Sequence, residues 1–180
     1  MLFVTFLGKH QFLIPANIFL ILYFIFIGHQ NWFSIRVLTI ALSSLVLMLL
    51  LKTLFQRKRP LSPLLTAARG LSFPSGHAIM AVTFYGLLLY IIRHATTVAW
   101  IKLAAAIMLI TLIFLIGYSR VYLRVHYASD VIAGFIIGAL WLAISLFVLD
   151  RVEEYATPDV NNPEMPAAEA KTSQPLEHEA

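Results

Sequence analysis

The 180-residue chain contains no cysteine, so it can form neither a disulfide framework nor a thiolate metal site. It is also poor in charge, because Asp, Glu, Lys and Arg together make up only 12% of its residues, where a soluble globular domain has about 25%. Hydrophobic residues make up 60% of the chain. This composition excludes a soluble globular domain and indicates an integral membrane protein.

Acidic residues are almost absent from the first 150 positions, since seven of the nine lie in residues 151–180. That last segment is rich in Pro, Ala and Glu, a composition that predicts a disordered tail. Of the two remaining acids, Asp150 falls where an apolar run ends, and we expect it at a solvated helix end. Asp130 falls inside an apolar run, where a carboxylate is costly, and is therefore a candidate functional residue.

Five apolar runs are long enough to cross a bilayer as helices, which takes about 17–25 residues. They cover residues 12–28, 35–54, 78–92, 98–118 and 127–149, and the first and third are near the lower limit. We therefore predict an all-α, polytopic transmembrane helical bundle in residues 1–150, followed by the acidic tail in residues 151–180. In the last run, Gly134 and Gly138 indicate close packing between two helices.

Three polar clusters interrupt the apolar runs. In the first, His126 precedes Asp130 by four residues, so on a helix the two share one face. The carboxylate can then fix which imidazole nitrogen carries the proton and leave the other free to act as a base or a nucleophile. Arg120 lies just upstream. Pairs of histidine and aspartate at this spacing are common on helix surfaces, so this pair indicates a functional site only in combination with the other two clusters.

The second cluster is "KTLFQRKRP", at the exit from the second run. We expect Arg57 and Lys58 to contact lipid headgroups, as basic residues at helix ends commonly do. Lys52 and Arg59, the latter followed by Pro60, suit a phosphoryl group. Arginine offers a planar fork of hydrogen-bond donors, and lysine offers a point charge.

The third cluster is "PSGH", residues 74–77, immediately before the third run. Ser75 is a candidate N-cap, and a helix that begins there directs its free N–H groups and the positive end of its dipole at a nearby anion. We expect His77 to lie beside that anion. Because successive spans alternate in direction, residues 52–77 and 119–127 emerge on the same side of the membrane. The three clusters can therefore form one site at the membrane surface.

Together these motifs resemble the signature of the type 2 phosphatidic acid phosphatases, a family that shares its active site with vanadium haloperoxidases and some acid phosphatases. The three parts of the signature read Lys52…Arg59-Pro60, Pro74-Ser75-Gly76-His77 and Ser119-Arg120…His126…Asp130. Bacterial membrane members of this family usually have six spans, whereas five are predicted here.

The resemblance implies a phosphatase that uses no metal and no cofactor, and a chain with one buried carboxylate and no cysteine also has too few hard ligands for magnesium or calcium. By the same resemblance, His126 would attack phosphorus to give a phosphohistidine, Asp130 would orient it, and His77 would protonate the departing oxygen. The phosphoryl oxygens would be held by Lys52, Arg59, Arg120, Ser75 and Gly76.

The expected substrate is a lipid phosphate or diphosphate whose chain stays in the bilayer, and undecaprenyl diphosphate, phosphatidic acid and phosphatidylglycerol phosphate are the candidates. We expect contact with membrane lipid and no nucleic-acid partner, and the sequence indicates no oligomeric state. The resemblance implies the inner (cytoplasmic) membrane, with the active site facing the periplasm or the outside and the tail in the cytoplasm. Two alternatives stay open: a lipid phosphotransferase of the same family, and a membrane protein that binds an anion or lipid, or transports it, without chemistry.

Overall fold

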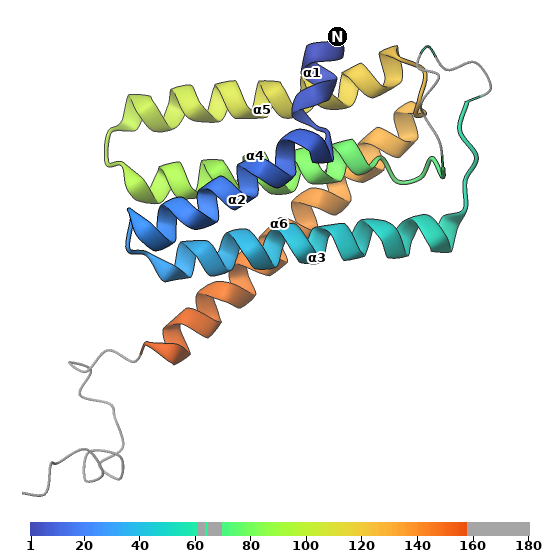
Figure 1. Cartoon of the computed structure of the whole chain (residues 1–180). Coiled ribbons are helices and arrows are strands. Elements are labelled where there is room, and N and C mark those ends of the chain that lie inside the picture. The colour runs from blue at the N-terminus through green and yellow to red at the C-terminus, as the bar shows by residue number, and fades with distance from the viewer. Residues whose placement is uncertain (61–63, 65–69, 158–180) are drawn as a thin grey trace, which may run out of the picture.

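The computed structural model describes residues 1–60, 64 and 70–157, and this part of the chain is all-helical (Figure 1). Its helices are α1 (Leu2–Leu7), α2 (His10–Phe26), α3 (Asn31–Phe55), α4 (Gly76–Ala95), α5 (Ala99–Tyr122) and α6 (Ala128–Ala156). From residue 158 onward the expected tail lies outside the described residues. However, α6 continues to Ala156, so the first residues assigned to that tail are helical.

The last four predicted spans are confirmed, because α3, α4, α5 and α6 are each long and apolar enough to cross a membrane. The first predicted span corresponds to α2, which has 17 residues. At a rise of 1.5 Å per residue it is about 26 Å long, somewhat less than the roughly 30 Å of a hydrocarbon core. Helix α1 was not among the predicted spans; it is short and apolar and packs against α5 before the chain turns into α2.

Helix α4 lies at the centre of the bundle and packs against α3, α5 and α6. Large apolar side chains on the outer helices, such as Leu50, Met108 and Leu140, are exposed. In water such a surface would be unfavourable, but acyl chains are as apolar as leucine and cover it without cost. The outside of the bundle therefore fits a lipid environment, and the polar side chains that are buried need an explanation of their own.

Two glycines bring α6 against α4, which confirms the predicted packing. A Cβ atom on Gly134 would lie 2.7 Å from the Ala78 Cβ and 2.9 Å from the Ser75 carbonyl oxygen. One turn further along, a Cβ on Gly138 would lie 3.1 Å from the Ile79 carbonyl oxygen. Any side chain at these positions would push the helices apart. The close crossing places the start of α4 next to the start of α6.

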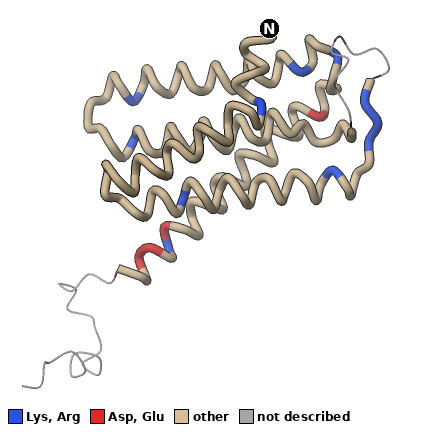
Figure 2. The backbone as a smooth tube through the Cα atoms, viewed as in Figure 1, with Lys and Arg blue, Asp and Glu red and all other residues tan. Residues whose placement is uncertain are grey.

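The two ends of the bundle differ in charge. At one end α3 and α5 finish and α4 and α6 begin, and Figure 2 shows several lysines and arginines there with one acidic residue. We call it the basic end. The other end carries the α2–α3 and α4–α5 connections and the last turns of α6, and it also holds cations, namely Arg36, Arg93, Lys102 and Arg151. We call it the acidic end because three of the four described acidic residues, Asp150, Glu153 and Glu154, lie there.

Candidate active site

The basic end contains every residue that the sequence analysis assigned to the site. The order along the chain is Lys52 near the end of α3, Arg59 beyond it, Ser75 as the N-cap of α4, Gly76 and His77 in its first turn, Arg120 near the end of α5, His126 between α5 and α6, and Asp130 in the first turn of α6. Three clusters that are up to 78 positions apart in the sequence therefore meet at one end of the bundle (Figure 1).

Lys52 holds the backbone that leads into α4. Its ammonium donates hydrogen bonds to the carbonyl oxygens of Leu71 at 2.9 Å and Pro74 at 3.2 Å. Gly76 packs against the same helix, because a Cβ on it would collide with the Met48 sulfur. Lys52 therefore fixes the "PSGH" segment through its carbonyls, in addition to placing positive charge beside it.

Arg59 lies directly against His126. Its Nη1 donates to the Val125 carbonyl oxygen at 2.8 Å and lies 3.3 Å from the Nε2 of His126. Since arginine can only donate, this second contact needs an Nε2 without a proton. The ring proton is then on Nδ1, which lies 3.5 Å from the Oδ2 of Asp130. This arrangement leaves a lone pair on Nε2, on the side of the ring where the cations lie.

Burial lowers the pKa of the His126 imidazole well below its ordinary value of 6.5, and the positive charges of Arg59, Arg120 and Lys52 lower it further, while Asp130 opposes them. His126 is 3% exposed. At neutral pH the ring is therefore uncharged, which is the protonation state that a nucleophilic imidazole needs.

Asp130 is completely buried, and both of its carboxylate oxygens accept hydrogen bonds. Arg57 donates to Oδ1 at 2.8 Å, and Oδ2 accepts from the Ser72 hydroxyl and from the Tyr127 backbone N–H at 3.0 Å. The Asp130 carbonyl oxygen accepts from the Ser75 N–H at 3.0 Å. A buried carboxylate is stable only when it is paired and hydrogen-bonded in this way. Asp130 thus connects the starts of α4 and α6.

Arg57 corrects one prediction. It was expected to contact lipid headgroups, but its guanidinium pairs with Asp130 and also lies 4.3 Å from the centre of the Tyr127 ring. Sequence gave no signal that separates Arg57 from its neighbour Lys58, since both belong to one basic run. Nor did it point to Ser72, which lies two residues before the "PSGH" motif.

The predicted pair of His126 and Asp130 is close in space, but not because the two residues share one face of a helix. His126 does not share a helix with Asp130, because α5 ends at Tyr122 and α6 begins at Ala128. Arg124 has a φ of +53° in the turn between them, and the chain folds back so that the His126 N–H reaches the Arg120 carbonyl oxygen. A turn, and not helical periodicity, brings the ring to the carboxylate.

Several polar atoms at this end are buried and have no hydrogen-bond partner among the described residues. They are the Ser75 hydroxyl, the Nε2 of His77, the Nε and Nη1 of Arg120 and the Nδ1 of His126. Ser75 is an N-cap by position, yet its hydroxyl makes no capping bond. The Nδ1 of His126 faces Asp130, whereas the other donors belong to Ser75, His77 and Arg120. Leaving a buried donor unpaired costs about 1–3 kcal/mol, so the donors of these three residues are well suited to an anion that accepts from all three.

Helix α1 covers one side of this group. A Cβ on Gly8 would lie 3.2 Å from the His77 ring, and the Thr5 and Ser119 hydroxyls are 2.6 Å apart. Ser119 immediately precedes Arg120. The helix that the sequence analysis missed therefore supports two of the site residues, and its short apolar sequence carries no motif that predicts this.

The fold and this cluster define an all-helical membrane protein with a buried, cation-rich cluster of polar side chains at one end. Residues 33–153 match the PAP2 superfamily. The chain is 33% identical over 138 residues to phosphatidylglycerophosphatase B of Bacillus subtilis (strain 168), which covers 76% of this chain and 68% of that protein. The chain therefore belongs to the PAP2 superfamily, as its signature predicts. It is a multi-pass membrane enzyme that hydrolyses lipid phosphates.

Two solved structures have a similar fold. One is the crystal structure of the first transmembrane PAP2 type phosphatidylglycerolphosphate phosphatase from Bacillus subtilis, with a TM-score of 0.72 and 28% identity over 86% of this chain and 75% of that one. The other is that of Aquifex aeolicus LpxE, with a TM-score of 0.58 and 31% identity over 80% of this chain and 81% of that one.

The contact between Arg57 and Asp130 predicts how His126 titrates. Replacing Arg57 by Gln removes a positive charge and leaves more of the Asp130 charge to favour imidazolium, so the pKa of His126 rises towards 6.5. Histidine NMR in detergent micelles, with the His126 resonance assigned by its loss in His126→Gln, measures this. The wild-type ring stays neutral down to about pH 5, while the Arg57→Gln ring begins to titrate at higher pH. Identical titrations, or an equal shift in the exposed control Lys58→Gln, would contradict the pairing.

Proposed function

We propose that this enzyme hydrolyses a lipid phosphate monoester through a phosphohistidine at His126, without a metal ion, and that phosphatidylglycerol phosphate is its substrate. The observation that carries the proposal is the group of buried donors from Ser75, His77 and Arg120, which have no partner within the described part of the chain and lie beside a neutral imidazole. An anion that fills this space satisfies them, and the lone pair on Nε2 is the nucleophile next to it.

Binding is the first step. A phosphoryl group that enters beside His126 takes over the hydrogen bond that Arg59 gives to Nε2 and accepts further bonds from the Arg120 guanidinium and the Ser75 hydroxyl. The N-terminal N–H groups of α4, which begins at Gly76, add their dipole, and Lys52 adds charge behind them. Because these donors are already in place and shielded from water, they stabilise the extra charge of the transition state.

The chemistry then follows in two displacements. The Nε2 of His126 forms a bond to phosphorus as the bond to the lipid oxygen breaks, and that oxygen takes a proton from His77. The Nδ1–H of His126 faces Asp130, which stabilises the positive ring that results. In the second step His77 takes a proton from water, the water oxygen binds phosphorus, and the bond to Nε2 breaks. Inorganic phosphate leaves, and both histidines return to their first state.

The choice of substrate rests on similarity. The relative that covers three quarters of this chain is a phosphatidylglycerophosphatase, and the solved structure with the TM-score of 0.72 is a phosphatidylglycerolphosphate phosphatase. Charge agrees with a phosphate ester held at the basic end, at the level where the spans leave the membrane. The glycerol headgroup can then reach the site while the acyl chains stay in lipid.

The roles of the two histidines are tested by changing the leaving group. His77→Asn is expected to slow hydrolysis of phosphatidylglycerol phosphate by about 10²–10⁴-fold, because the lipid alkoxide leaves poorly without a proton. The same variant keeps much more of its activity on p-nitrophenyl phosphate, whose phenolate leaves unaided. His126→Ala loses activity on both. Phosphate release in EDTA is the measurement.

Equal losses on both substrates in His77→Asn, with the fold intact, would make His77 a phosphate ligand instead of the acid. Activity that disappears in EDTA and returns with added magnesium would contradict the metal-independent route. Lys58→Gln is the matched control, because this residue is exposed and belongs to the same basic segment.

We also propose that the basic end faces the periplasm or the outside. The rule that positive charges stay inside favours the opposite orientation, but Lys52, Arg57 and Arg59 are engaged within the site and so have a reason of their own to be there. The chain has no native cysteine, so single cysteines report orientation. In intact cells an impermeant thiol reagent is expected to label Leu64→Cys and to spare Thr97→Cys, both at exposed positions. The reverse labelling pattern would overturn the orientation.

A further inference from the structure

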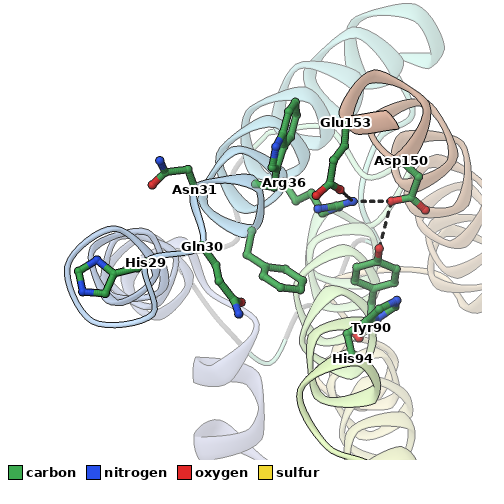
Figure 3. A pocket seen from close by; sticks show the side chains of 10 residues that line it. His29, Gln30, Asn31, Arg36, Tyr90, His94, Asp150 and Glu153 are labelled. Atoms are coloured by element: carbon green, nitrogen blue, oxygen red, sulfur yellow. Dashed lines mark hydrogen bonds and ion pairs between the residues drawn. The ribbon is translucent and has the colours of Figure 1, made fainter. Parts of the chain in front are cut away.

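A polar cavity lies at the acidic end, remote from the candidate active site. It has a volume of about 730 Å³ and is bounded by the α2–α3 connection, the start of α3, the end of α4 and the last turns of α6 (Figure 3). None of its lining residues belongs to the phosphatase signature. The apolar part of α6 ends at Leu149, next to this cavity. The cavity therefore opens at the level of the lipid headgroups.

One wall of the cavity is negative. The Arg36 Nη2 donates to Asp150 Oδ1 at 2.6 Å and to Glu153 Oε2, and the Tyr90 hydroxyl donates to the same Asp150 oxygen at 3.0 Å. Asp150 is thus more than the solvated helix end that the sequence predicted. One guanidinium is shared by two carboxylates, so this group carries a net charge of −1. Among the described residues, Asp150 Oδ2 and Glu153 Oε1 accept no hydrogen bond, and both are available to a cation.

The facing wall is suited to an anion. Helix α3 begins at Asn31, and its N-cap Gln30 makes no side-chain capping bond. The Phe33 N–H donates to the Gln30 carbonyl oxygen at 3.1 Å, but among the described residues the N–H groups of Asn31 and Trp32, which both line the cavity, have no partner. His29 and Gln30 project from the same wall in Figure 3, across from Asp150 and Glu153. The Arg36 side chain is 5% exposed, and its Nε has no partner among the described residues. A buried guanidinium N–H without an acceptor is a second, separate indication that a ligand supplies one.

We propose that this cavity binds a zwitterion that carries an ammonium group and a phosphate. The ammonium contacts the free oxygens of Asp150 and Glu153, and the phosphate contacts the start of α3 and the Arg36 Nε. A simple cation would leave the start of α3 and the Arg36 Nε unpaired, and a simple anion would meet the net negative charge of the carboxylates. The headgroup of an aminophospholipid and a soluble phosphodiester with an amine share this chemistry.

Such a ligand would join α3, α4 and α6 at the acidic end. The same three helices carry Lys52, His77 and Asp130 at the basic end, so occupancy stabilises the bundle that holds the active site. A ligand that binds only the folded state raises the melting temperature by mass action. Thermal unfolding of the full-length protein in detergent micelles therefore reports binding without any assay of phosphatase activity.

The test compares three probes: phosphatidylethanolamine, phosphatidylglycerol with the same acyl chains, and soluble glycerophosphoethanolamine. The key variant is Glu153→Gln, which brings the wall close to neutral yet leaves Arg36 paired with Asp150, so the buried guanidinium keeps a partner. Its matched control is Glu154→Gln, an exposed residue that pairs with Arg151 and does not line the cavity. Dissociation constants come from the rise in melting temperature with probe concentration.

Phosphatidylethanolamine is expected to bind the wild type at least tenfold more tightly than phosphatidylglycerol. Its affinity falls about tenfold in Glu153→Gln, as expected for loss of one charged hydrogen bond, and stays unchanged in Glu154→Gln. Binding of glycerophosphoethanolamine with the same affinity and the same loss in Glu153→Gln identifies the soluble source, whereas binding of the lipid alone identifies the membrane. Equal affinity for the two lipids, or equal effects of the two variants, overturns the proposal.

Discussion

The structure of the basic end depends on how one carboxylate is buried. Asp130 has no exposed surface, and a buried charge without partners would cost several kcal/mol, so the chain surrounds it with donors from separate segments. Arg57 comes from the segment after α3, Ser72 from the segment before α4, and the Tyr127 N–H from the start of α6. The backbone carbonyl oxygen of Asp130 also accepts a hydrogen bond from the N–H of Ser75, the N-cap of α4. Through these bonds one residue fixes the relative positions of the segments that carry the proposed phosphate-binding residues.

The glycines of α6 make this arrangement possible. With Gly134 against Ala78 and the Ser75 carbonyl, the helices approach closely enough for the Ser75 N–H to reach Asp130. Positive side chains that lie this close together repel one another, but each of them contacts a different group of the protein. Lys52 binds carbonyl oxygens, Arg57 binds the carboxylate, and Arg59 binds a carbonyl oxygen and His126. Arg120 alone keeps two buried donors unpaired among the described residues, and this supports its proposed role in binding a phosphoryl group.

Sequence predicted what depends on residue type and spacing. The apolar runs gave the long helices because lipid requires such runs, and the three motifs gave the site residues because phosphate binding requires cations, a helix start and an imidazole. What it missed depends on three-dimensional neighbours. Arg57 and Lys58 are adjacent basic residues that the sequence does not distinguish. Only the path of the chain after α3 brings Arg57 into contact with Asp130. The turn at Arg124, the support from α1 and the cavity beside Arg36 likewise arise from contacts between segments that no local pattern encodes.

The central claim is that the chain's own cations and His126 replace a metal ion in phosphoryl transfer. The most direct measurement is ³¹P NMR of enzyme mixed with excess phosphatidylglycerol phosphate in EDTA and then denatured in alkali, where phosphohistidine survives. The account predicts a phosphoramidate on Nε2 of His126, the nitrogen beside Arg59. Phosphate on another side chain, or a phosphoenzyme that forms only when a divalent metal is supplied, would contradict it.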